Sequence, residues 1–175
     1  MFSDNSLLPK ETIRLAALGM LSDRPLAYAD LANEVRQFVG RIASPSLELA
    51  GPSIELLRYE GLVEPISDAK DAPLRLTDDG HEELLSLLKA TVRPPLTDMS
   101  KLVIALKMRF MELLKPAERR DQIDLMIDAC ELELARLNDL RDPAADATLF
   151  QEWLDQDIAS GEARLAWLRD LRSRV

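Results

Sequence analysis

The segment SPSLELAGPSIELLRYEGLVEP, from Ser44 to Pro65, constrains the fold more than any other part of the chain. Its first part repeats apolar residues at spacings of three and four, which is the period of a helix with one buried face. Ser44 or Ser46 can cap the start of that helix, whereas Pro52 predicts a bend or a break inside it. The helical pattern stops at Gly61, and β-prone residues follow without a linker. The fold must therefore place a short strand directly behind this helix.

Two predicted helices precede this segment, and a hairpin and another helix follow it. The first helix begins at Pro9 in PKETIRLAALGMLSDRPL and is apolar around most of its circumference. The second, in AYADLANEVRQFVG, is expected to end at Gly40, because glycine commonly follows a helix. The pieces GLVEPIS and APLRLT predict a β-hairpin, and Thr77 can cap the helix of TDDGHEELLSLLKAT. This order predicts a winged helix-turn-helix with a short β-hairpin wing over about residues 1–91.

The two consecutive prolines of VRPPLTD predict a linker at about residues 92–96. Three further helices are predicted after it, and each carries an apolar stripe. Their apolar surface is too large to be buried against one small winged helix, so they are expected to pack on each other and on a second copy of the chain. The sequence thus predicts a mostly α protein with a C-terminal helical dimerisation region over residues 97–175, assembled as a homodimer.

The composition excludes several classes of protein. Hydrophobic residues make up 47% of the chain, enough to bury a sizeable core. No apolar run approaches the roughly 18 residues of a membrane span, and the N-terminus lacks the basic start of a signal peptide, so a cytoplasmic location without membrane contact is expected. The single cysteine, Cys130, and the single histidine, His81, cannot build a multi-ligand metal site. Because no phosphate-binding loop or nucleophile motif occurs either, we expect no enzyme activity, no metal and no cofactor.

The negative charge of the chain is unfavourable for a winged helix that binds DNA. The formal net charge is −9, and the predicted helix after Ser46 carries Glu48, Glu55 and Glu60 against one arginine, Arg58. Proteins that bind nucleic acids normally present a basic face, because neutralising phosphates supplies much of the affinity. A winged-helix module that has lost DNA binding, and that binds a protein or senses a ligand, is therefore the alternative function.

Several motifs together resemble the PadR-like family of transcriptional regulators. LAALGMLSDRPL, Pro45-Ser46, EGLVEP and LTDDG occur in the order and spacing of that family's N-terminal winged helix, and LLKPAERRDQIDLMIDACELELARL resembles its C-terminal dimerisation region. The chain departs from the family where Gly51 replaces a tyrosine of the third helix. It also departs on the second wing strand, where Ala72, Pro73 and Leu74 replace basic and aromatic residues and leave Arg75.

The resemblance implies a homodimeric, DNA-binding transcriptional regulator, most simply a repressor that a small hydrophobic or aromatic effector releases. The residues expected to contact double-stranded DNA lie at the start of the third helix, along it and on its flanks: Tyr28, Ser44, Ser46, Leu49, Ser53, Arg58, Lys70 and Arg75. Two of these roles have an alternative, since Ser46 can instead cap its helix and Arg58 can instead pair with Glu55. The residues expected to line an effector pocket are Met108, Phe110 and Trp153.

Overall fold

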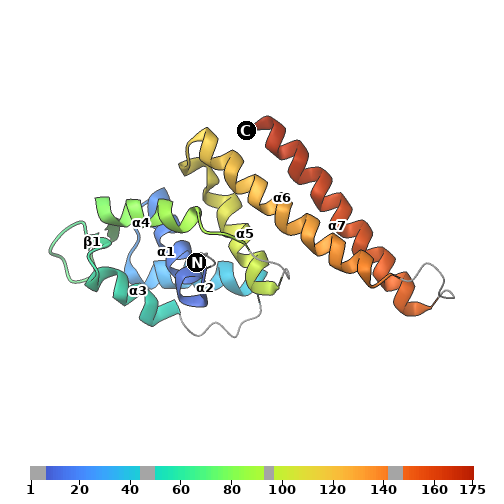
Figure 1. The fold of residues 1–175 in the computed structure, drawn as a ribbon. Coiled ribbons are helices and arrows are strands. Elements are labelled where there is room, and N and C mark those ends of the chain that lie inside the picture. Colours follow the sequence, from blue (N-terminus) through green and yellow to red (C-terminus); the bar gives the residue numbers. More distant parts are fainter. Residues whose placement is uncertain (1–6, 44–49, 93–96, 142–147) are drawn as a thin grey trace, which may run out of the picture. The chain divides into compact units, whose positions relative to one another are not determined.

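The computed structural model describes residues 7–43, 50–92, 97–141 and 148–175 (Figure 1). For residues 50–53 it describes only the backbone. The chain divides into two compact units, which are described separately below. The first unit comprises residues 1–91 and 98–114, and the second comprises residues 92–97 and 115–175. The expected mostly α fold, with one short hairpin, is confirmed.

Helix α1 (Pro9–Asp23) is the centre of the first unit. It packs against α2 (Tyr28–Ile42), α3 (Ala50–Tyr59), α4 (Asp78–Leu88) and α5 (Asp98–Phe110), and against strand β2 (Leu74–Leu76). All residues of α1 from Leu15 to Leu21 are buried, so α1 is enclosed around its circumference as its all-round apolar pattern predicts.

The hairpin of the first unit consists of β1 (Val63–Pro65) and β2 (Leu74–Leu76), paired antiparallel. Leu26, just after α1, adds a bridge to its outer side through two backbone hydrogen bonds with Leu74, of 2.7 and 3.1 Å. This third extended segment anchors the base of the hairpin to α1, so the hairpin stands beside α3 as the wing of the fold.

The junction between α3 and the wing explains why glycine occurs at two positions. Gly61 has a φ of 74°, and the Gly61 and Leu62 amides donate to the carbonyls of Arg58 and Leu57, which is the Schellman closure of a helix. Gly80, in the first turn of α4, lies so close to the backbone that an added Cβ would be 1.9 Å from the Leu62 carbonyl oxygen. Glycine is therefore required at one site by φ and at the other by space.

Thr77 joins these two sites. Its hydroxyl donates to the Gly61 carbonyl at 2.8 Å and accepts from the Gly80 amide at 3.0 Å, and its own amide donates to the Leu62 carbonyl at 3.1 Å. One threonine thus caps α4 and also ties it to the end of α3, as the position of Thr77 predicts for the cap.

The course of two helices differs from what the sequence predicts. Helix α3 runs through Pro52, so the break that this proline could cause there is not present. Helix α2 does not end at Gly40 but continues to Ile42, because Val39 and Ala43 are both buried and the Ala43 amide donates to the Val39 carbonyl. The caps expected at Ser44 or Ser46 lie outside the described residues.

Helix α5 groups with the winged helix, whereas the sequence predicts a C-terminal helical region over residues 97–175. Leu102, Leu106 and Phe110 belong to the same core as α1. The Phe110 ring lies against Gly19, where an added Cβ would be 2.3 Å from it. Lys107 is 1% exposed, and its Nζ donates to the Leu88 carbonyl at the end of α4 over 2.6 Å. The short 3₁₀ helix η1 (Met111–Leu113) follows α5.

The second unit is built on a pair of long helices, α6 (Pro116–Asp139) and α7 (Leu149–Arg174), packed along each other. Gly161 permits their close approach, since a Cβ there would be 2.7 Å from Leu134. Asp124 binds Arg172 through two hydrogen bonds, of 2.8 and 3.1 Å. Within the described part of the chain, none of the helices is both long and apolar enough to cross a membrane.

Cys130 faces α7 from the interior of this pair. It is buried, and its thiol lies 3.5 Å from the Gly161 carbonyl. Burial raises the pKa of the Cys130 thiol, so the neutral form is favoured, as expected of a packed cysteine.

Candidate nucleic-acid interface

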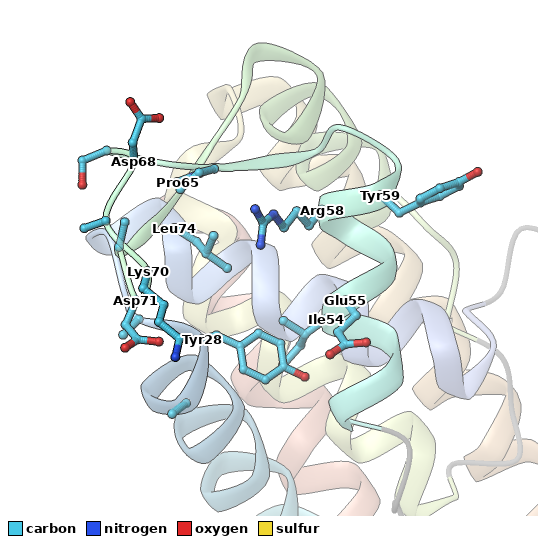
Figure 2. A pocket seen from close by; sticks show the side chains of 15 residues that line it. Tyr28, Ile54, Glu55, Arg58, Tyr59, Pro65, Asp68, Lys70, Asp71 and Leu74 are labelled. Atoms are coloured by element: carbon cyan, nitrogen blue, oxygen red, sulfur yellow. The ribbon is translucent and has the colours of Figure 1, made fainter.

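A cavity of about 880 Å³ lies between the start of α2, the exposed face of α3 and the wing (Figure 2). Its lining combines apolar residues at the base with charged residues around them: Ala27, Tyr28, Ala29, Ile54, Glu55, Arg58, Tyr59, Pro65, Ser67, Asp68, Ala69, Lys70, Asp71, Ala72 and Leu74. Ile54 and Leu74 are buried and belong to the core, so the base of the cavity is rigid. The charged side chains are exposed and free to meet a ligand.

The helical period of α3 separates its buried and exposed residues. Ile54 and Leu57 are 1% and 0% exposed and fix the helix on the core. Glu55, Arg58 and Tyr59 are exposed, and Figure 2 shows the Arg58 side chain extending into the cavity toward the wing while Tyr59 points away from it. Tyr59 is 90% exposed, which is unusual for an aromatic side chain that serves only stability.

Tyr28 is the first residue of α2 and lines the cavity between α3 and the wing. Its ring points toward α3, with the hydroxyl near Glu55 (Figure 2). Burial, together with the negative charge of Glu55, raises the pKa of the Tyr28 phenol, so the neutral hydroxyl is retained as a hydrogen-bond donor.

The carboxylates near α3 do not all face the cavity. Glu60 binds Arg14 of α1 at 2.8 Å, and the same guanidinium lies 3.1 Å from Glu83 of α4. One arginine thus neutralises two carboxylates on the side of α3 that faces α1 and α4. The negative charge of Glu60 is therefore not presented with Arg58.

The cations of this region fall into two groups. Arg75 binds Glu64 across the hairpin, at 2.7 Å from Nη2 to Oε1, so its charge is compensated. Arg58 and Lys70 both line the cavity, and within the described ranges no carboxylate forms an ion pair with either of them. The expected alternative for Arg58, a pair with Glu55, is not formed in the structure. Arg58 and Lys70 are therefore the cations available to an anionic ligand.

The structure brings together three of the residues expected to contact DNA, namely Tyr28, Arg58 and Lys70. Arg75 lies on the wing but does not line the cavity. Ser44, Ser46 and Leu49 are outside the described residues, as is the side chain of Ser53 on α3. Glu55 and Tyr59 were not expected to belong to the site. Their spacing of one and five residues from the buried Ile54 could have indicated their exposure.

The residues expected to line an effector pocket lie on two helices. Met108 and Phe110 are on α5, where Phe110 is 3% exposed and packed on Gly19. Trp153 is on α7, where its ring lies 5.8 Å from that of Phe150. An effector pocket formed by these residues stays a prediction. Among the described residues, no three or more His, Cys, Asp or Glu side chains gather in a way that could hold a metal ion.

The three-helix core, with a wing that follows the third helix directly and flanks a cavity, defines a winged helix-turn-helix protein. Residues 2–172 match the family model described as "Putative AphA-like transcriptional regulator". The chain therefore belongs to the family of AphA-like transcriptional regulators.

Solved structures that resemble the chain include three of one bacterial regulator. No curated protein matches the chain. The crystal structure of Bacillus subtilis PadR is 20% identical over 97% of this chain and 97% of its own, with a TM-score of 0.42. Its complex with p-coumaric acid is 20% identical over 93% and 98%, with a TM-score of 0.42. Its complex with operator DNA is 21% identical over 92% and 97%, with a TM-score of 0.39.

Proposed function

We propose that the protein is a DNA-binding transcriptional regulator, a homodimeric repressor whose hold on its operator is released by a small hydrophobic or aromatic molecule. The observation that carries the proposal is the cavity between α3 and the wing, which Arg58 and Lys70 line as cations that pair with no carboxylate among the described residues. Membership of a family of transcriptional regulators supports the same conclusion.

In this proposal α3 enters the major groove and the wing lies over the adjacent backbone. Arg58 and Lys70 contact phosphates, and the Tyr28 hydroxyl donates to a phosphate oxygen. Glu55, the carboxylate of α3 beside these cations, accepts from the amino group of a cytosine, which is the base edge that suits a carboxylate. An acidic helix can act in this way because Arg14 holds the Glu60 charge on the other side.

The proposal is tested by retention of genomic DNA fragments on the purified protein, followed by sequencing and by titration of the selected site at several salt concentrations. Each phosphate contact contributes about 0.9 to the slope of log K against log salt. Arg58→Ala should therefore lower the slope by about 2 for a dimer with one Arg58 in each protomer. Lys101→Ala, on the surface of α5, is the control and should leave the slope unchanged.

An unchanged slope in Arg58→Ala would remove Arg58 from the phosphate contacts. If the protein retains no DNA fragment even at low salt, the proposal that it binds DNA is refuted. The alternative, a winged-helix module that binds a protein or a ligand, would then stand, in keeping with the paired charges of Arg14 and Arg75.

The homodimer is proposed from the surface of the second unit. Several large apolar side chains on α6 and α7, together with Leu140 directly after α6, are between 48% and 84% exposed in the single chain: Leu132, Leu140, Leu149, Phe150, Trp153 and Trp167. Large apolar side chains exposed in this number are expected to be covered by a second copy of the chain. Light scattering should give twice the 19.7 kDa of the chain at micromolar concentration, and a monomer mass would refute the dimer.

A further inference from the structure

The outward face of α3 is apolar over its second half. Ile54 and Leu57 fix the helix on the core. With 3.6 residues per turn, Tyr59 lies about 140° around the helix from Ile54 and about 160° from Leu57, so its side chain is directed into solvent. Leu56 lies on the same face, three residues before Tyr59, and is 48% exposed. The two side chains form one apolar surface on the helix that is opposite to its core contacts.

The charged side chains at this end of α3 lie to the sides of that surface. Arg58 extends into the cavity beside the wing (Figure 2). Glu60, directly after α3, is bound by Arg14 on the side of α1 and α4. Glu55 is exposed one turn before Tyr59. In the part of α3 whose side chains the structure describes, the outward surface therefore consists of a leucine, an aromatic ring and one carboxylate.

The groups around this surface suit the major groove of DNA. Arg58 and Lys70 line the adjacent cavity, pair with no carboxylate among the described residues and can bind phosphates. A groove that receives α3 must then accommodate two apolar side chains against its base edges. The C5 methyl of thymine is the apolar group that the major groove offers there. Guanine is bound by arginine or lysine instead, and Arg58, the only basic residue of α3, is directed toward the wing.

We propose that Leu56 and Tyr59 determine the base specificity of the protein by contacting the C5 methyl groups of thymines. The inference rests on the proposed function, in which α3 enters the major groove and Glu55 accepts from a cytosine. Leu56 covers one methyl group and the ring of Tyr59 lies against another. Neither contact needs a hydrogen-bond donor, so an acidic helix can read a sequence in this way. The preferred site contains thymines close to that cytosine.

The test uses a pool of random-sequence DNA duplexes, from which the full-length protein selects its site. Each thymine of the selected duplex is then replaced in turn by uracil, which forms the same base pair but lacks the C5 methyl. At the positions that α3 contacts, uracil should weaken binding by the wild type by about fourfold per methyl group, which corresponds to the burial of one such group.

Variants assign each methyl group to a side chain. Leu56→Ala and Tyr59→Ala should each bind the thymine duplex more weakly and should no longer distinguish thymine from uracil at the position that the removed side chain contacts. Tyr59→Phe should keep the distinction, because the ring and not the hydroxyl makes the contact. Leu113→Ala is the matched control, since Leu113 is an exposed leucine on η1, and it should distinguish the two bases as the wild type does.

Equal binding of thymine and uracil duplexes by the wild type would overturn the inference, as would full discrimination in both Leu56→Ala and Tyr59→Ala. Either result would leave the proposed function intact, because a duplex has been selected. Both side chains are exposed, so their removal leaves the core unchanged. Selection of no duplex even at low salt would refute the proposed function, and the reading of thymine would fall with it.

Discussion

Lys107 places an amine in the core of the first unit, and this predicts a measurable dependence of stability on pH. The side chain is 1% exposed, and burial lowers the pKa of the Lys107 ammonium from 10.5 to about 8. Between these pH values the unfolded chain holds a proton that the folded protein has released. The free energy of unfolding contributed by this group must therefore rise with pH across that window.

The size of the effect follows from the shift. A displacement of two to three pH units corresponds to about 3 kcal/mol between the two protonation states. The destabilisation by the buried charge is fully present below about pH 8 and is lost as the pH approaches 10.5. The hydrogen bond from Lys107 to the Leu88 carbonyl is lost in any apolar variant, so the pH dependence is a cleaner measure than the stability at one pH.

The assay is urea unfolding of the wild type and of Lys107→Met at several values between pH 7 and 11. All other ionisable groups are common to the two proteins, so their contributions cancel in the difference. As the pH rises, the free energy of unfolding of the wild type should increase relative to that of Lys107→Met. The slope of this difference against pH should approach the value for one proton, and the total increase should be about 3 kcal/mol. Parallel pH profiles would show that Lys107 keeps its ordinary pKa in the folded state and would refute the reasoning.

Further predictions concern glycine positions and the wing. Gly80→Ala should lower the free energy of unfolding by about 2–3 kcal/mol, because its Cβ would overlap the Leu62 carbonyl, and urea denaturation that shows no loss would contradict this close approach. Gly40→Ala, in an open helical position, should instead raise it by up to about 1 kcal/mol in the same assay. Glu64→Gln should tighten DNA binding and steepen its salt dependence, because it releases Arg75; titrations identical to those of the wild type would argue against any role of Arg75 at the DNA.

The sequence indicated the cations of the candidate site, but not which charged residues would form ion pairs. Tyr28, Arg58 and Lys70 were expected from their places in the winged-helix order, and the structure collects them around one cavity. The two ion pairs that decide which charges remain available join distant parts of the chain. Arg14 is 46 residues from Glu60, and Arg75 is 11 residues from Glu64. The first pair depends on which helix faces which, and the second depends on the register of the two wing strands. The spacing of residues along the chain contains neither.

The sequence by itself determined the features that depend on a few neighbouring residues. The period of α3, its closure at Gly61 and the cap at Thr77 each follow from local hydrogen bonds and from the φ that glycine allows. Tertiary structure alone decided where α5 belongs. Its apolar stripe could have packed on α6 and α7, but Phe110 fits over Gly19 and Lys107 reaches the end of α4, so α5 joins the winged helix. An apolar stripe specifies that a helix face is buried, whereas the shape and polar groups of the opposing surface select its partner.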